Sequence, residues 1–301
     1  MSGGVGSGQD LGSDDRAMPG SVEGRPKRPG VLKLIAWTLL DELYAGWRQL
    51  ALLGGTRRPA AWREGDDALP EVVLLPGVYE HWTFLRPLGN ALNAAGHRVR
   101  VVRGLGTNRI PIAETAHRTA AAIAAAPAPA AGRVIVAHSK GGLVGKHVLM
   151  DQEAAAQASS SDAAAGPGAD ADADADADAA AVGPATAAAA ADADAARVLG
   201  LVAICTPFAG SRYARLFVDP TIRALRPSDE TIVRLAAAAS VNAGIVSVFG
   251  VFDPHVPEGS ELAGATNVRV PAAGHFRILR APATAKAVCE GIAHLASRDA
   301  T

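Results

Sequence analysis

Apolar and polar positions follow two different periods along residues 70–298 of this 301-residue chain. Short apolar runs rich in β-branched residues predict six strands, at 71–75, 98–102, 133–138, 198–204, 245–252 and 267–270. Segments with apolar residues at helical spacing lie between and after them, at 82–95, 113–126, 143–150, in pieces between 212 and 239, and at 283–296. Strands that alternate with helices build a mostly parallel sheet covered on both faces. Because no hairpin pattern precedes Glu71, we predict a minimal six-stranded α/β fold.

An amphipathic segment precedes this unit at 31–54. Its apolar residues recur at helical spacing and form one wide face, made up of Leu32, Ala36, Leu39, Leu43, Trp47 and Leu50. No apolar run is long enough to span a bilayer, because charged residues interrupt it at Lys33, Asp41, Glu42 and Arg48. We expect the apolar face to pack against the body of the protein. The alternative is peripheral contact of 31–53 with a membrane surface or a partner protein.

Two segments have compositions that do not support a packed core. Residues 1–30 are rich in Gly, Ser, Pro and charge, and they lack the basic start and apolar core of a secretory signal. Residues 152–196 form an Ala/Asp-rich insertion with nine carboxylates and no Lys or Arg, so the rest of the chain carries a net charge of +8. Neither segment can bury enough apolar surface to offset its ordering entropy, and we expect both to be disordered.

A serine stands at a strand-to-helix junction. Ser139 directly follows an apolar strand, and a helical segment begins within a few residues of it. A nucleophile elbow is such a turn: it pushes a Ser hydroxyl out of the sheet and needs small residues two positions before and after it. Ala137 and Gly141 meet that need, in an A-x-S-x-G variant of the usual G-x-S-x-G. We predict that Ser139 is a nucleophile; a turn without chemistry is the alternative.

An acid and a base follow this serine in the order that an elbow nucleophile requires. The base takes the serine proton, the acid orients the base, and each stands on a loop after a later strand. Asp253 comes directly after the strand 245–252, and His275 follows the strand 267–270. The three side chains therefore fall at one rim of the predicted sheet. The alternatives are an Asp-Pro turn, an ordinary loop histidine, or Glu258 as the acid.

The other histidines fit the role of base less well. His255 stands two residues after Asp253, which is too close in sequence to leave its strand and reach Ser139. His138 precedes the serine and is expected to pack beneath the neighbouring loops. The helical patterns contain the remaining candidates, His117, His147 and His294.

Attack on a carbonyl creates an oxyanion that needs hydrogen-bond donors. They are normally the backbone N–H after the nucleophile and one from the loop after the first central strand. Lys140 has the first position and Val78 is the best candidate for the second, with Tyr79 as the alternative. The next aromatic residues, His81 and Trp82, are candidates together with Tyr79 for binding substrate; packing in the core is the alternative.

These motifs resemble those of the α/β-hydrolase superfamily, and among its members the small bacterial esterases and lipases. The matching pieces span about 70–298 apart from the insertion: the loop 75–79, the elbow 137–141, the acid and histidine loops, and a T-P-x-x-G-S turn at 206–211. Two positions depart from the usual pattern, with Pro76 before the oxyanion glycine and Ala137 in the elbow. The resemblance implies Ser139 as nucleophile, His275 as base, Asp253 as orienting acid, and Val78 and Lys140 as oxyanion donors.

The expected function is hydrolysis of carboxylic esters, small-molecule or lipid, through an acyl-enzyme. A thioesterase, an acyltransferase or a non-catalytic binding protein of the same fold is the alternative. Cys205 and Cys289 lack the spacing of a metal or redox motif, so we expect reduced thiols in a cytoplasmic protein, membrane-associated if 31–53 contacts lipid. No metal, cofactor or nucleic-acid motif stands out. The sequence leaves the oligomeric state, the substrate and the roles of both appendages open.

Overall fold

The computed structural model describes residues 29–50, 52, 55–127, 129–164 and 197–299. It contains one six-stranded sheet in the order β2-β1-β3-β4-β5-β6, and every neighbouring pair is parallel. The strands are β1 Glu71–Leu75, β2 Val99–Val101, β3 Arg133–His138, β4 Gly200–Ile204, β5 Ile245–Phe249 and β6 Thr266–Arg269. After β1, the chain places β2 on one side of β1 and then crosses over to place β3 on the other side, so the direction of strand addition reverses at β1. In open α/β sheets, ligands bind in a crevice at the carboxyl ends of the strands beside such a reversal.

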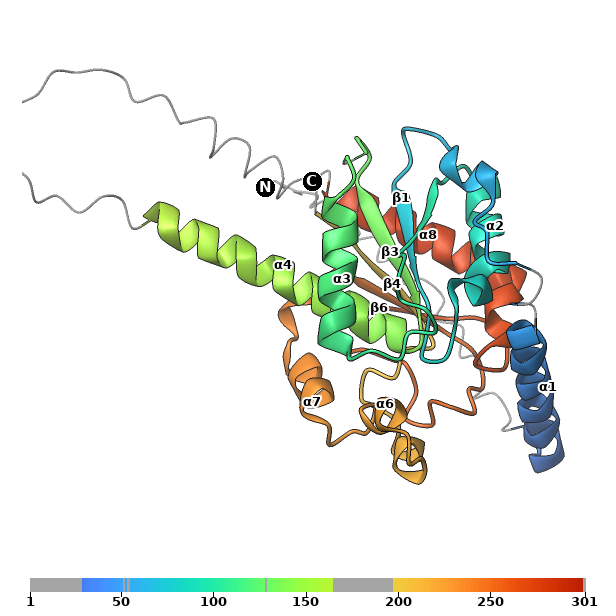
Figure 1. Ribbon diagram of the computed structural model, residues 1–301. Coiled ribbons are helices and arrows are strands. Elements are labelled where there is room, and N and C mark those ends of the chain that lie inside the picture. Colours follow the sequence, from blue (N-terminus) through green and yellow to red (C-terminus); the bar gives the residue numbers. More distant parts are fainter. Residues whose placement is uncertain (1–28, 51, 53–54, 128, 165–196, 300–301) are drawn as a thin grey trace, which may run out of the picture.

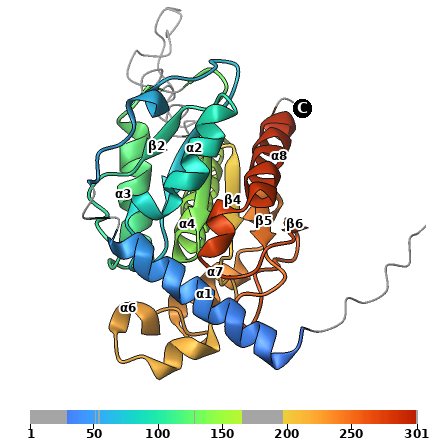
Figure 2. The same ribbon diagram turned by 90° about the vertical axis from the view of Figure 1, so that its right-hand side faces the viewer.

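Helices cover both faces of this sheet (Figures 1 and 2). The α-helices are α1 Val31–Leu50, α2 Arg86–Ala94, α3 Ile112–Ala124, α4 Lys140–Ala164, α6 Pro220–Arg223, α7 Glu230–Ala237 and α8 Pro282–Asp299. The 3-10 turns are η2 Ala60–Arg63, η3 Trp82–Leu85, η4 Arg212–Leu216, η5 Ser240–Gly244 and η6 Arg277–Arg280. The sequence patterns are thus confirmed in type and order; most ends shift by a few residues, and α4 extends well beyond its predicted end.

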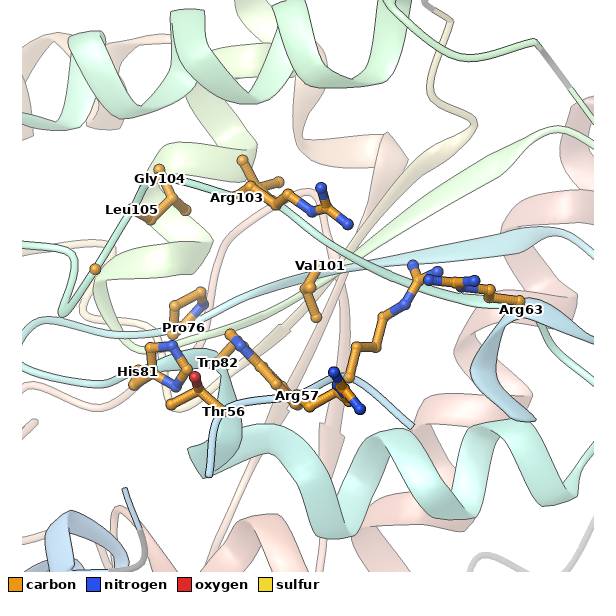
Figure 3. A pocket seen from close by; sticks show the side chains of 13 residues that line it. Thr56, Arg57, Arg63, Pro76, His81, Trp82, Val101, Arg103, Gly104 and Leu105 are labelled. Carbon is orange, nitrogen blue, oxygen red and sulfur yellow. The ribbon is translucent and has the colours of Figure 1, made fainter. Parts of the chain in front are cut away.

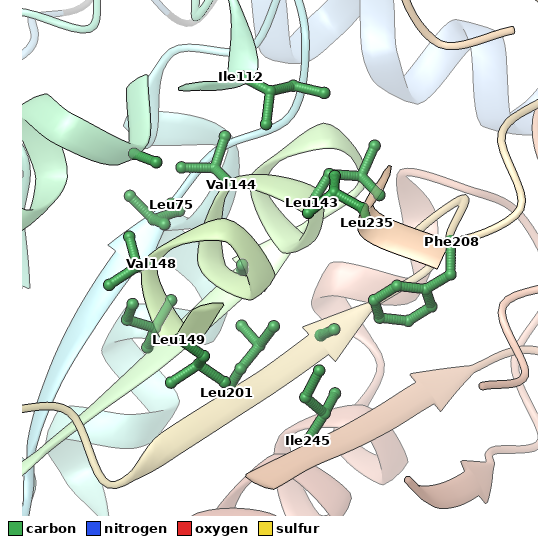
Figure 4. Packing of buried hydrophobic residues seen from close by; sticks show 14 of the residues in the cluster. Leu75, Ile112, Leu143, Val144, Val148, Leu149, Leu201, Phe208, Leu235 and Ile245 are labelled. Atoms are coloured by element: carbon green, nitrogen blue, oxygen red, sulfur yellow. The ribbon is translucent and has the colours of Figure 1, made fainter. Parts of the chain in front are cut away.

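Alternate residues of each strand enter separate cores on the two faces. Val73 and Leu75 of β1 pack with α3 and α4, in a core that Figure 4 shows around Leu143, Val144 and Val148. Val72 and Leu74 face the other way, and the core on that side includes α2 and α8. Because all of these strand residues are buried, the strands read in the sequence as continuous apolar runs rather than alternating ones. No helix in the described part of the chain is long and apolar enough to cross a bilayer.

The orientation of α1 differs from the sequence expectation. Asp41, Tyr44 and Arg48 are its buried residues. The predicted apolar face is exposed instead, with Leu43 70 % and Trp47 58 % accessible. Figure 2 shows the helix lying across the surface of the body. The prediction that the apolar face packs inward is wrong because the polar face supplies partners for buried backbone groups, as described below.

The first part of the acidic insertion is helical. Helix α4 continues to Ala164, so residues 152–164 belong to it and were wrongly expected to be disordered. Ala, Gln and Glu, which are strong helix formers, dominate residues 152–157 and extend the elbow helix outward. The remainder, 165–196, lies outside the described residues, as does the predicted tail up to residue 28.

Candidate active site

Ser139 occupies a tight turn between β3 and α4. Its backbone has the left-handed φ of 52°, which is unfavourable for a residue with a side chain. Hydrogen bonds on both sides hold it there: its N–H donates to Ile204 O at 2.9 Å, and its carbonyl accepts from Gly142 N at 3.0 Å and from Thr206 Oγ1 at 3.1 Å. A strained residue that its surroundings fix so firmly is a feature of functional sites.

Two glycines allow other backbone to approach this turn. A Cβ on Gly141 would lie 2.5 Å from Leu75 O, so α4 can start beside the end of β1 only without a side chain at that position. A Cβ on Gly77 would lie 2.9 Å from Ser139 Cβ. The loop after β1 therefore comes directly against the serine.

His275 and Asp253 form a direct hydrogen-bonded pair. His275 Nδ1 lies 2.7 Å from Asp253 Oδ2, and the imidazole is buried. The other carboxylate oxygen, Oδ1, accepts from the backbone N–H groups of His255 at 2.8 Å and Val256 at 3.1 Å. Glu258, the alternative acid, instead accepts from Arg212 N at 3.0 Å. The carboxylate of Asp253 is thus fixed in position, and with Nδ1 as the donor His275 keeps Nε2 free of a proton.

The charges of this pair shift both pKa values. Burial lowers the pKa of His275, but the charge and hydrogen bond of Asp253 outweigh it, with help from Glu80 and Asp41, and raise the pKa above 6.5. Burial raises the pKa of Asp253, but the charge and hydrogen bond of His275 hold it well below its usual range. Asp253 therefore remains a carboxylate at neutral pH, while His275 titrates above the pH of an isolated histidine.

Helix α1 holds the histidine loop from outside through Asp41. This fully buried carboxylate accepts from His275 N at 2.7 Å, Phe276 N at 3.0 Å and Arg277 N at 2.8 Å. Gly274, before the histidine, has a φ of 105°, and a Cβ there would clash with the carboxylate. Asp41 was not among the predicted site residues, since a charge on an amphipathic helix usually indicates a solvated face.

A second buried pair joins the loops beneath Ser139. His138 Nδ1 lies 2.7 Å from Glu80 Oε1, and Nε2 lies 2.9 Å from the carbonyl oxygen of His275. The other oxygen of Glu80 accepts from Gly77 N at 2.9 Å. Because a carbonyl can only accept, Nε2–H of His138 donates to it, and Nδ1 faces the carboxylate. His138 thus packs under the neighbouring loops, as expected from its position.

Ser139 and His275 line one cavity of about 320 Å³. Most of its wall is apolar and comes from the loop after β1, the segment after β4, and the acid and histidine loops: Val78, Pro207, Ala214, Leu216, Phe217, Ile222, Leu225, Val256 and Phe276. His255 also lines it, with its ring centroid 5.0 Å from that of His275. His255 was expected to stay away from the site because it stands only two residues after Asp253 in the sequence. This expectation is wrong, because the 253–256 turn brings His255 back toward the cavity.

The predicted oxyanion residues flank the serine. Val78 lines the cavity, and Lys140 begins α4 as the residue after Ser139. The Lys140 side chain takes no part in the cavity: its Nζ donates to Asn108 O at 2.8 Å. Burial lowers the pKa of Lys140 to about 8.

The three residues expected to bind substrate lie elsewhere. Tyr79 has a left-handed φ of 60°, and its hydroxyl donates to Asp219 outside the cavity lining. His81 and Trp82 line a different cavity, of about 410 Å³, and Trp82 is largely buried against Trp62, with ring centroids 5.5 Å apart. Much of the apolar cavity wall instead comes from residues 207–225.

That second cavity is basic. Arg57, Arg58, Arg63 and Arg103 line it, and Figure 3 shows three of them around Val101, with His81 toward the other end. Among the described residues none of these four arginines forms an ion pair with a carboxylate. Burial lowers the pKa of Arg58, as do the charges of Arg63, Arg100 and Arg103, so the cluster is under mutual repulsion.

Two groups of potential metal ligands occur around His275 in the described chain. They are Glu80 with His138 and His275, and Cys205 with Asp253 and His275. Their donor atoms already pair with one another, and Cys205 is a fully buried thiol whose pKa is raised by burial and by Asp253. These donor atoms are therefore used in the hydrogen bonds that support the serine and histidine loops rather than arranged around a metal ion.

The fold matches solved structures of hydrolases. The mature lipase BlEst2 of Bacillus licheniformis has a TM-score of 0.51 and 12% sequence identity, over 76% of this chain and 94% of that one. The metagenomic carboxyl esterase MGS0156 gives a TM-score of 0.46 at 15% identity, with 81% of this chain and 80% of that chain covered. The thioesterase domain from the curacin biosynthetic pathway gives a TM-score of 0.43 at 12% sequence identity, with 75% of this chain and 92% of that chain covered.

Sequence comparison adds no relative: no protein-family model matches the chain, and no curated protein does. The chain therefore has an α/β-hydrolase-like fold, with a six-stranded parallel sheet flanked by helices, and is similar in fold to the lipase BlEst2 at low sequence identity.

Proposed function

We propose that the protein is a serine hydrolase that cleaves carboxylic esters through an acyl-enzyme. The observation that carries the proposal is the 2.7 Å bond from His275 to Asp253, with His275 in the same cavity as the left-handed Ser139. A serine on such a turn, a buried imidazole and a fixed carboxylate are the three components of nucleophilic acyl transfer.

In the first half-reaction, Ser139 Oγ attacks the ester carbonyl while Nε2 of His275 takes the hydroxyl proton. Asp253 stabilises the resulting imidazolium, consistent with the raised pKa of His275. The backbone N–H groups of Val78 and Lys140 donate to the oxyanion. Collapse of the tetrahedral intermediate breaks the bond to the alkoxide, which receives the proton from His275.

In the second half-reaction, water attacks the acyl-enzyme. His275 takes a proton from the water, and Ser139 leaves with that proton when the second intermediate collapses. The products are a carboxylic acid and the free enzyme, so the cycle needs no cofactor.

The apolar wall of the cavity supports an apolar acyl group as substrate. Phe217, Leu216 and Ile222 contribute side chains that cannot hydrogen-bond a polar group but can contact a hydrocarbon chain. Nitrophenyl esters of increasing acyl length, with a thioester of the best acyl group, would define the substrate range.

The test is ester turnover by matched serine variants. We expect Ser139→Ala to lose at least three orders of magnitude in kcat, because the nucleophile is removed. Ser247→Ala is the control: Ser247 is also buried, but its hydroxyl donates to Ser260 O outside the cavity. The proposal fails if the two variants have similar turnover while both remain folded.

A further inference from the structure

Helix α1 presents an apolar face that no described residue covers. Of the fourteen exposed large hydrophobic residues in the described part of the chain, eight lie on this helix: Val31, Leu32, Ile35, Leu39, Leu40, Leu43, Trp47 and Leu50. Leu32 is 84 % exposed and Leu43 is 70 % exposed. A contiguous apolar surface of this kind marks an interaction site rather than ordinary protein surface.

The opposite face of α1 is fixed to the body, so the helix cannot turn its apolar side inward. Asp41 accepts three backbone N–H groups of the histidine loop, and Arg48 donates to the carbonyl of Thr83. Glu42 lies 2.8 Å from His255 Nε2. Rolling the helix would leave the buried carboxylate and these N–H groups without partners, which is costly in a protein interior. These contacts therefore hold α1 with its apolar face pointing away from the body of the protein.

The long undescribed stretches of the chain are poor candidates to cover this face. Residues 1–28 and 165–196 together contain one Leu, two Met and three Val as large apolar residues. These segments have too few large apolar side chains to cover the eight that α1 exposes.

Positive charge lies at both ends of α1. Lys33 is exposed in the first turn of the helix. Beyond the other end is the basic cavity of Figure 3, lined by Arg57, Arg58, Arg63 and Arg103. The two features adjoin, because Arg48 of α1 bonds Thr83 and the neighbouring Trp82 lines the cavity. Two copies of such a face would repel each other, whereas an anionic surface is attracted.

We propose that α1 docks the protein on the surface of an anionic phospholipid bilayer. The helix lies in the plane of the interface with its Leu and Trp side chains among the acyl chains nearest the headgroups, and the flanking basic residues contact lipid phosphates. This arrangement combines apolar burial with charge attraction, which is the physical basis of peripheral helix binding. It goes beyond the proposed ester hydrolysis and does not depend on it.

Vesicle sedimentation with the full-length protein tests the docking. We expect binding to phosphatidylcholine vesicles that contain phosphatidylglycerol, weaker binding to phosphatidylcholine alone, and a decrease with added salt. Leu39→Gln/Leu43→Gln/Trp47→Gln should lower the affinity by at least about tenfold, because apolar burial is lost. Arg57→Gln/Arg58→Gln should lower it roughly fivefold per arginine on anionic vesicles. Ser139→Ala should bind like the wild type, which separates docking from catalysis.

Val233→Gln is the matched control, since Val233 is an exposed apolar residue on α7, away from α1. It should leave binding unchanged, and melting temperatures should confirm that every variant is folded. Wild-type protein that does not sediment with anionic vesicles would overturn the proposal. So would a dimer in analytical ultracentrifugation that the triple variant abolishes without any vesicle binding, because a second copy would then be the occupant.

Discussion

At the scale of single residues, the site depends on how its charged groups are held. Asp253 is fixed by two backbone N–H groups as well as by His275, and Asp41 fixes the backbone of the histidine loop. One carboxylate therefore sets the protonation of the imidazole and another sets its position. The two functions are separable by mutation.

Asp253→Asn should lower kcat by about four orders of magnitude, because an amide neither enforces the tautomer nor stabilises the imidazolium. In the wild type, kcat/KM should rise with pH through a midpoint above 6.5, since neutral His275 is the active base and Asp253 raises its pKa. The variant loses the charge of Asp253, so its midpoint should lie below that of the wild type. A pH–rate profile of each protein measures both kcat and the midpoint. If the midpoint of Asp253→Asn equals that of the wild type, a group other than His275 titrates.

Asp41→Asn should weaken the histidine loop. An amide retains a single acceptor oxygen where the carboxylate accepts three N–H groups, so we expect the free energy of unfolding to fall by roughly 1–3 kcal/mol. kcat should fall more than KM changes, and hydrogen exchange at residues 275–277 should accelerate. Glu42→Gln is the control, because its contact with His255 is half-exposed and worth less than about 1 kcal/mol. Equal exchange in the two variants would refute a positioning role for Asp41.

At the scale of elements, the meeting of β1, β3 and α4 determines the geometry of the site. Gly141 stands in the first turn of α4, and a Cβ there would meet the carbonyl oxygens of Leu75 and Pro76 at 2.5 and 2.8 Å. The strand ends and the helix start can therefore come together around Ser139 only with glycine at this position.

Gly141→Ala should destabilise the protein by more than about 3 kcal/mol, since backbone atoms rather than a flexible side chain must move. Gly46→Ala is the contrasting change: nothing lies within 4 Å of a Cβ on this helical glycine, and we expect a gain of about 0.5–1 kcal/mol. Urea unfolding of both variants measures the difference. A Gly141→Ala protein as stable as the wild type would show that the turn is less tightly packed than described.

At the scale of the whole molecule, the sequence predicted the sheet and the order of the site loops because both depend on local patterns. Buried parallel strands are continuous apolar runs, and Asp253 and His275 stand on the loops that follow β5 and β6, a few residues past the strand ends. The orientation of α1 could not be predicted in this way, since Asp41 meets residues more than 230 positions away. Which side chains of 207–225 line the cavity could not be predicted either, because short turns without a regular period build this segment.

The most direct test of the account is the position of a covalent adduct. Treating the full-length protein with a fluorophosphonate and mapping its peptides by mass spectrometry should locate the phosphonyl group on Ser139. Labelling should be absent in Ser139→Ala, and its rate in the wild type should rise with pH as His275 loses its proton. An adduct on another residue, or no adduct in folded wild-type protein, would contradict the assignment of Ser139 as the nucleophile.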